Sequence, residues 1–82
     1  MDIIFLWRNY AMPAIIKVTP RLSEILKERG LTQMWLSQET GVPQGSLSRF
    51  DKNDRHVDVH VVAIMTALNI TYDELFAIEY SD

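Results

Sequence analysis

Apolar residues recur at helical spacing early in the chain. The residues at positions i, i+3 and i+4 that predict one buried helix face are Leu22, Ile25 and Leu26. Thr19 and Pro20 precede this face, as an N-cap and a first helical residue typically do. Gly30 follows it, at the place where a left-handed residue often ends a helix. We therefore predict a first helix over residues 20–29.

A second short helix is expected to begin at its N-cap, Thr32, and to end near Thr40. Gly41 then supplies the positive φ that a tight turn requires. Val42 follows, and its side chain is expected to fill the space between this helix and the next one.

Pro43 is expected to open a third helix over residues 44–52, because its φ is already close to the helical value. Leu47 and Phe50, three positions apart, would face the core. Asn53 is expected to end this helix in the left-handed conformation, as glycine often does.

The stretch HVDVHVV at residues 56–62 fits two periodicities. Its valines alternate as in a strand, whereas the next apolar residues follow helical spacing: Val61, Ile64, Met65 and Leu68. We favour a fourth helix over residues 59–68, with Asp58 as its N-cap and Asn69 at its end.

Thr71 and Glu74 form a capping-box pattern that predicts a short fifth helix over residues 72–76. Two stretches with strand-like alternation lie near the ends of the chain, at residues 14–18 and 76–80. We expect them to pair. A two-stranded ribbon is weak alone, so it would need the helices or a second subunit for support.

Residues 1–13 are predicted to be an apolar N-terminal extension of a single domain over residues 14–82. The run Ile3–Trp7 is too short to cross a bilayer, which takes about 20 residues, or to act as a signal peptide. No membrane association is expected, and the cytoplasm is the expected compartment. Such an apolar run should be covered by the domain or by a partner.

Length and charge narrow the possible functions. The 82 residues suit one small domain, and the absence of cysteine excludes disulfides and thiolate metal sites. The net charge is −3, yet residues 17–55 hold seven basic and five acidic side chains. The overall charge argues against DNA binding over the whole surface, but it leaves room for a locally positive docking face.

Catalysis and cofactors find little support in the sequence. No nucleophile–base arrangement, phosphate loop or acidic pair is present, so we expect neither enzymatic activity nor a cofactor. His56 and His60 lie four residues apart, as two metal ligands on a helix can, but no third ligand is evident. A pH-sensitive surface histidine is the simpler interpretation, and no metal site is predicted.

The centre of the chain resembles the helix-turn-helix family of Cro, lambda-repressor and XRE-type regulators. The matching residues are Gln33, Ser37, Gly41, Val42 and the triplet Leu47-Ser48-Arg49. The segments at 67–71 and 73–75 also look like the fourth and fifth helices of that family. The resemblance covers about residues 20–76. It implies a mainly α, five-helix lambda-repressor-like domain that binds DNA, with the terminal strands as a possible addition.

The resemblance also implies roles for two glutamines, Gln33 and Gln44, which open the second and third helices. Gln33 would hold a phosphate and support Gln44, which would read a base. A carboxamide suits this task, because it forms two hydrogen bonds with adenine. The alternative for either residue is a solvated position in the first turn of its helix.

Further residues are assigned by their position on the third helix and in the loop after it. The expected base-reading residues are Gln44, Gly45, Ser46, Ser48 and Arg49. The expected phosphate-binding residues are Thr32, Gln33, Lys52, Asn53 and Arg55.

Two features depart from the family pattern, and one matching residue has an alternative role. Trp35 stands where a polar residue is usual, and we expect it to contact the N-terminal arm or a partner. Asp51 and Asp54 should weaken the positive potential near the phosphates. For Arg49, a salt bridge to Asp51 or Glu39 is as reasonable as a contact with DNA.

These observations predict a sequence-specific transcriptional regulator, a small repressor of phage, prophage or mobile-element type. It would bind a palindromic operator in double-stranded DNA as a homodimer, through the fifth helix, the strand 76–80 and the apolar run. The alternative is a protein-interaction module on the same scaffold, like an antitoxin or an anti-repressor.

Overall fold

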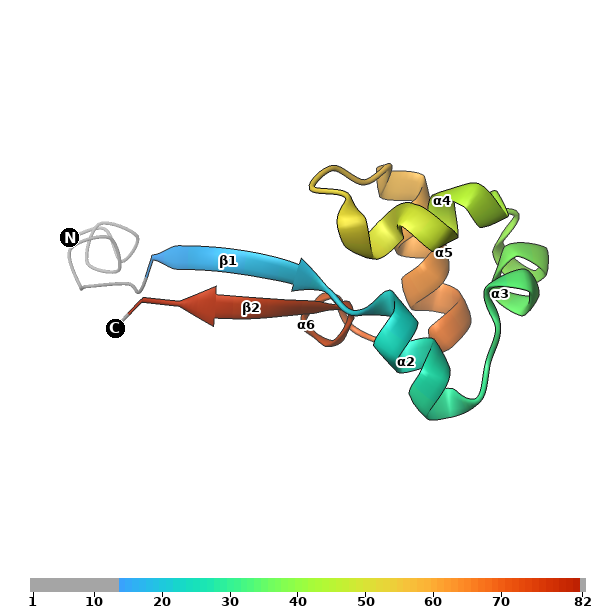
Figure 1. The fold of residues 1–82 in the computed structure, drawn as a ribbon, viewed down its shortest axis with the longest axis horizontal. Helices are drawn as coiled ribbons and strands as arrows, with labels where there is room; N and C mark the ends of the chain where they lie inside the picture. The colour runs from blue at the N-terminus through green and yellow to red at the C-terminus, as the bar shows by residue number, and fades with distance from the viewer. Residues whose placement is uncertain (1–13, 82) are drawn as a thin grey trace, which may run out of the picture.

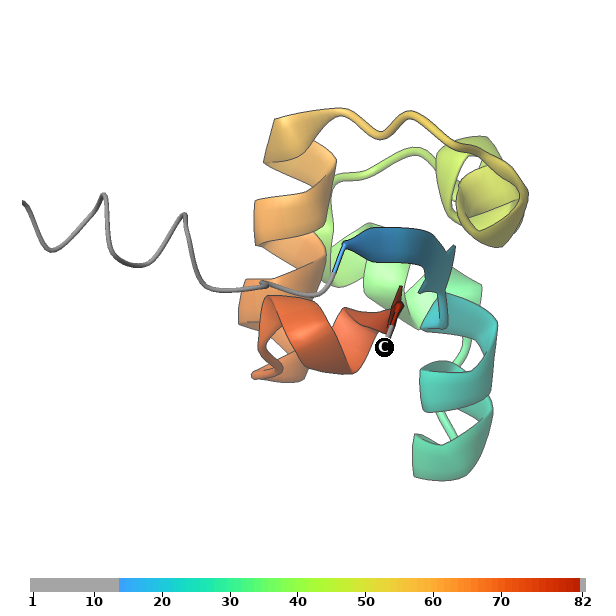
Figure 2. The ribbon, with the colours of Figure 1, turned by 90° about the vertical axis from the view of Figure 1, so that its left-hand side faces the viewer.

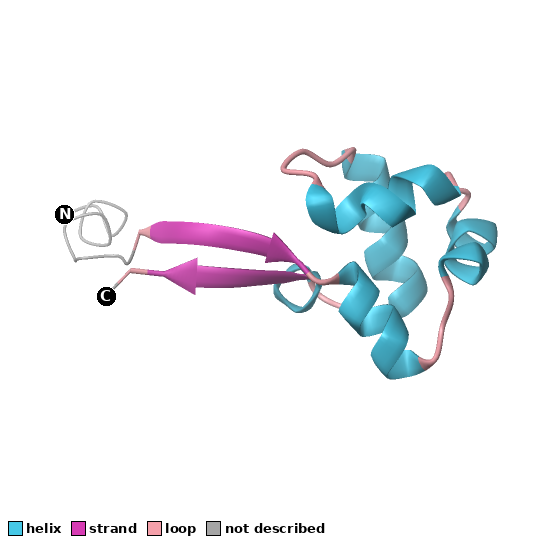
Figure 3. Ribbon diagram, in the orientation of Figure 1, coloured by secondary structure: helices cyan, strands magenta, loops and turns pink. Residues whose placement is uncertain are grey.

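The structure is a computed structural model, and it describes residues 14–81 (Figure 1). Within these residues, five α-helices and one short 3-10 helix pack together, and a two-stranded ribbon projects from them (Figure 3). The elements are β1 (Ile15–Pro20), α2 (Leu22–Arg29), α3 (Gln33–Thr40), α4 (Gln44–Arg49), η1 (Phe50–Lys52), α5 (Asp58–Leu68), α6 (Tyr72–Leu75) and β2 (Phe76–Tyr80). The extension expected at 1–13, with its apolar run, lies outside the described residues.

One hydrophobic core joins the helices. Its buried residues are Leu22, Ile25, Leu26, Leu36, Val42, Leu47, Phe50, Ile64, Leu68, Ile70, Leu75 and Phe76. Every helix of residues 14–81, including η1, contributes at least one of them, so no helix is stable through its own propensity alone. The predicted inward faces of the first and third helices are therefore confirmed.

The first helix begins later than its sequence predicts. Pro20 pairs with Phe76, so the strand continues through Thr19 and Pro20, and the helix starts at Leu22 with Arg21 as its N-cap residue. Thr19 as an N-cap and Pro20 as the first helical residue were therefore wrong predictions, because strand pairing takes these two residues. Gly30 does end the helix, at φ 65°.

Two more helix ends differ from their predictions. Asn53 has an extended backbone, with φ −92° and ψ 140°, because the last turn after α4 tightens into η1 and the chain then leaves for the loop. Asp58 is the first residue of α5, not its N-cap. The carbonyl of Val57 already accepts a hydrogen bond from the Val61 N–H at 3.1 Å, which moves the N-cap one residue earlier.

Other predicted ends are confirmed. Thr32 caps α3 by accepting a hydrogen bond from the Trp35 N–H at 3.0 Å. Asn69 ends α5 at φ 53°, and the Thr71–Glu74 capping box opens α6. Local chemistry sets these ends, so the sequence alone reveals them.

The two terminal strands pair in antiparallel fashion, as predicted. Figure 1 shows the ribbon leaving the helices on the side away from α3. In Figure 2, which looks along the ribbon, α5 and α6 lie on one side of it and α2 and α4 on the other. The base of the ribbon is thus held by the helices, whereas its tip stands free of them.

A candidate DNA-binding surface on α3 and α4

The turn between α3 and α4 is fixed by short-range hydrogen bonds. The Ser37 hydroxyl donates to the carbonyl of Val42 at 2.6 Å, and the Gly41 N–H donates to the carbonyl of Ser37 at 2.8 Å. Gly41 has φ 76°, which glycine adopts without strain. Val42, only 3% exposed, fills the space between the helices as predicted. The angle between α3 and α4 is therefore set by a rigid corner.

The outer face of α4 carries the predicted base-reading residues. Gln44, Gly45, Ser48 and Arg49 are exposed and Ser46 is half-buried, whereas Leu47 points into the core. Pro43 precedes α4 as its N-cap residue, and its carbonyl accepts a hydrogen bond from the Ser46 N–H. The Ser48 hydroxyl donates to the carbonyl of Gly45 at 3.0 Å. This face is open to solvent, and its contacts with DNA remain predictions.

Arg49 lies back over Gly45. A Cβ atom added at Gly45 would be 3.5 Å from the nearer Nη atom of Arg49. The guanidinium therefore lies within van der Waals reach of a side chain at position 45. Within residues 14–81, Arg49 forms no salt bridge to Asp51 or Glu39, so the alternative role expected for it is not observed.

The predicted phosphate-binding residues divide into two groups. Thr32 and Gln33 stand at the start of α3, where the Thr32 hydroxyl already caps the helix and the Gln33 side chain is half-buried. No hydrogen bond joins the amides of Gln33 and Gln44 in the part of the chain that the structure describes. The second group follows α4, and all of its members are exposed: Lys52, Asn53 and Arg55.

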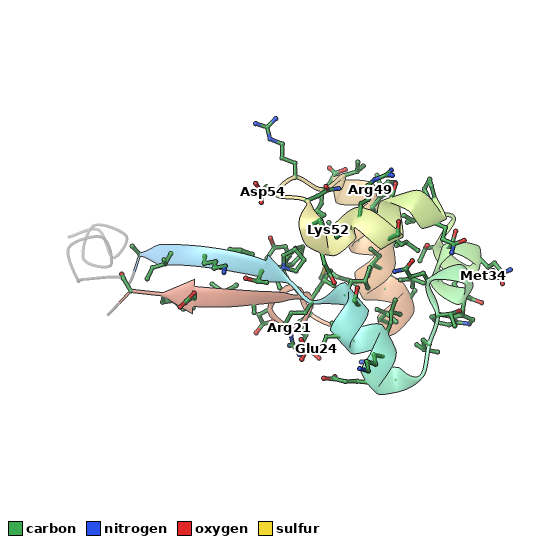
Figure 4. All side chains as sticks on the ribbon, viewed as in Figure 1. Arg21, Glu24, Met34, Arg49, Lys52 and Asp54 are labelled. Atoms are coloured by element: carbon green, nitrogen blue, oxygen red, sulfur yellow. The ribbon has the colours of Figure 1, made fainter. Side chains whose placement is uncertain are left out.

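Figure 4 shows that Arg49, Lys52 and Asp54 come from the segment running from α4 through η1 into the loop. Arg55 extends this basic segment, and Asp54 is its exposed acidic member. Basic side chains thus lie beside the open face of α4, which is the local positive charge that DNA docking requires.

Asp51 has a structural role that the sequence did not reveal. Its Oδ1 and Oδ2 atoms accept hydrogen bonds from the backbone N–H groups of Leu22 and Ser23, both at 2.9 Å. These N–H groups open α2 and have no partner inside the helix. The carboxylate is thus engaged as a helix cap, and our expectation that it would mainly oppose phosphate binding was incomplete. A partner 29 residues away leaves no local signal.

Two aromatic residues singled out in the sequence have partners inside the domain. Trp35 is half-buried and packs against the core, and its expected contact with the N-terminal arm or a partner lies outside the described residues. His56 Nε2 lies 2.7 Å from the carbonyl oxygen of Phe50. The centroid of the His56 ring lies 4.1 Å from that of the Phe50 ring and 5.5 Å from that of the Phe76 ring. This packing assigns His56 to the domain structure.

Residues 14–81 contain no group of three or more His, Asp or Glu side chains arranged to hold a metal ion. Over the same range, no helix combines the length and the apolar character needed to cross a membrane.

A comparison with known protein families identifies the family to which this segment is similar. The family described as the Cro/C1-type HTH (helix-turn-helix) DNA-binding domain matches residues 21–80. Comparisons with curated proteins and with solved structures found no match. The matched segment contains α2 through β2 and all residues of the turn described above. The chain belongs to the family of Cro/C1-type helix-turn-helix DNA-binding domains.

Proposed function

We propose that this protein is a sequence-specific DNA-binding transcriptional regulator that reads the major groove with α4. The observation that supports this most directly is the open outer face of α4, held by the rigid turn from Ser37 to Val42. A B-DNA major groove is about 12 Å wide and admits one helix. α3 would then cross the backbone beside the groove, as the first helix of such a pair does.

The proposed roles follow from position and chemistry. Gln44, at the exposed first turn of α4, would form two hydrogen bonds with an adenine. Arg49 would read a guanine from farther along the same face. Lys52 and Arg55 would neutralise phosphates beside the groove, and these contacts would give affinity without sequence preference.

The protein would act as a small cytoplasmic repressor of the phage or mobile-element type, bound as a homodimer to a palindromic operator. One domain of this size offers few contacts, so two half-sites are needed for tight binding. The two copies of α4 would then stand about 34 Å apart, one turn of DNA.

Selection of bound sequences from a random DNA pool tests this proposal. The expected result is a palindromic consensus with half-sites about 10 base pairs apart. A pool that gains no consensus after selection, although the protein is folded, would contradict sequence-specific reading.

A second candidate function is a protein-interaction module. It is favoured by three exposed valines at the start of α5: Val57, Val59 and Val62, which are 55%, 69% and 61% exposed. Val59 and Val62 line a shallow apolar depression with Ala63. Gel shifts of the pure protein with random-sequence DNA at low salt separate the two functions. Shifted bands favour the regulator, whereas no shift and a co-purifying protein favour the module.

A further inference from the structure

The two faces of the ribbon have opposite chemistry. Side chains alternate along each strand, and directly paired residues share a face. Val18 pairs with Ile78, and Ile15 pairs with Tyr80, so these four side chains lie on one face. The residues paired on the other face are Lys17 with Glu79 and Thr19 with Ala77. The ribbon is therefore amphipathic.

A bulge in β1 brings Ile15 onto the apolar face. Lys17 pairs with Glu79, and a regular ladder would place Ile15 opposite Ser81, on the same face as Lys17. The register shifts between Ile15 and Lys17, so that Ile15 instead pairs with Tyr80 on the apolar face. Ile16, the extra residue of the bulge, is 64% exposed. Irregular pairing here serves a continuous apolar face.

This apolar face begins in the core, and its outer part is exposed within residues 14–81. Phe76, at its base, is 3% exposed, but Val18 is 43%, Tyr80 53% and Ile15 61% exposed. The ring of Tyr72 stacks on that of Phe76 at 4.5 Å and is itself half exposed. Beside them lies an open hollow of about 350 Å³, lined by Val18, Tyr72 and Phe76 on the ribbon side and by Asn53, Asp54 and His56 of the loop after η1.

The chemistry of this face suits a second copy of the same face. In a two-fold dimer the same patch of each copy forms the contact. A charged residue in that patch would therefore lie close to the same charge on the other copy. Within the paired strands the apolar face has none, because Lys17 and Glu79 lie on the other side of the ribbon, but the charged residue Asp54 lines the hollow at its base. Its exposed side chains offer on the order of 500 Å² per copy, or about 1,000 Å² over two copies, which is the minimum expected of a biological interface. Two stacked ribbons would also support each other, since one ribbon alone is marginal.

We infer that the apolar face of the ribbon, formed by Ile15, Val18, Ile78 and Tyr80 with Tyr72 at its base, binds the same face of a second copy. This inference specifies the contact within the homodimer of the proposed function, and it rests on that function. The face lies on the ribbon and contains no residue of α4, whereas Asn53 of the expected phosphate-binding group lines the hollow at its base.

Sedimentation equilibrium of full-length variants tests the contact. Ile15→Asp puts a charge on the apolar face near the free tip, where unfolding is least expected. Thr19→Asp puts the same charge on the polar face of the same strand and serves as the matched control. We expect the wild type and Thr19→Asp to be dimers, and the dissociation constant of Ile15→Asp to rise at least 100-fold. Circular dichroism checks that each variant remains folded.

Other outcomes would overturn the inference. These are a monomeric wild type, or an Ile15→Asp variant that still forms the wild-type dimer. The inference would also be overturned if Ile15→Asp left the dimer intact while Phe5→Asp in the apolar run, or Val59→Asp on α5, dissociated it.

A gel shift on random-sequence DNA at low salt distinguishes this failure from failure of the proposed function. A folded monomeric variant should still bind such DNA through α4 and its neighbouring basic residues. If the wild type forms the dimer but binds no DNA, the contact stands and the proposed function fails.

Discussion

The Asp51 carboxylate accepts a hydrogen bond from the Leu22 N–H at 2.9 Å, across 29 residues of sequence. The other carboxylate oxygen accepts from Ser23. Asp51 belongs to η1, directly after α4, and Leu22 is the first residue of α2. The end of the proposed recognition segment is thereby attached to the start of the first helix. This bond joins the proposed DNA-binding surface to the rest of the fold.

Replacement of Asp51 should destabilise the domain. Asp51→Ala removes both acceptors and leaves two N–H groups of α2 without a protein partner, so we expect a loss of about 1–3 kcal/mol in the free energy of unfolding. Asp51→Asn keeps one acceptor and should lose less. Urea unfolding measures both. Asp54→Ala, an exposed neighbour, is the control and should change the free energy by less than about 0.5 kcal/mol. Equal losses for the two alanine variants would refute the capping role.

Gly45→Ala should separate stability from DNA binding. Gly45 lies inside α4 at an ordinary negative φ, so alanine should raise the free energy of unfolding by about 0.5–1 kcal/mol. The added methyl group would touch the Arg49 guanidinium and thicken the face that enters the groove, so operator affinity should fall. Thermal unfolding and DNA titration measure the two effects.

Gly41→Ala is the control for this experiment. At φ 76° a Cβ atom is strained, so this variant should lose stability instead. A Gly45→Ala protein that binds the operator as well as the wild type would show that the groove tolerates the extra methyl group.

Much of the fold could be predicted from the sequence because its helix ends are local. Thr32, Gly41 and Asn69 act within one turn of their own helices, and all three were identified correctly. Thr19 and Pro20 also carried a local helix signal, but pairing with β2 overrides it. The cap on α2 and the register shift at Ile15 depend on partners distant in sequence, so no local pattern indicates them.

Glu24 should make a small contribution to the pH dependence of stability. Its hydrogen bond from Arg21, together with the nearby positive charge, holds the pKa of Glu24 below its ordinary value of 4.5. A carboxyl whose folded pKa is lowered stabilises the fold above its unfolded pKa, and the contribution is lost as the pH falls through the folded value.

The Glu24→Gln variant tests this effect. The pair is exposed, so the wild type should lose only slightly more stability than Glu24→Gln between pH 6 and about pH 3. Thermal unfolding across this range measures the difference. The opposite order, with Glu24→Gln losing more, would contradict the lowered pKa.

Binding to DNA should weaken steeply with salt, and Lys52 should account for part of that dependence. Lysines that contact phosphates release counterions, so Lys52→Gln should reduce the slope of log K against log salt by about 1. Lys27→Gln, on the exposed side of α2, should leave the slope unchanged. Fluorescence titrations from about 50 to 200 mM salt measure both slopes. An unchanged slope for Lys52→Gln would remove it from the proposed phosphate contacts.

The site was more predictable in its residues than in their local contacts. The spacing from Gln33 to Arg49 matched a known pattern, and the structure places Gln44, Ser48 and Arg49 on an open face. The position of the Arg49 side chain over Gly45 depends on rotamers, which a one-dimensional pattern does not encode. The engagement of Asp51 with α2 gives this carboxylate a structural role that the local pattern does not indicate.

The central claim, that α4 reads bases through its exposed tip, is tested most directly by the affinity of Gln44→Ala for its selected operator and for random DNA. Loss of two hydrogen bonds to one base should cost about 1–3 kcal/mol on the operator and little on random DNA. An equal loss on both DNAs, with the fold intact, would show that Gln44 does not read a base.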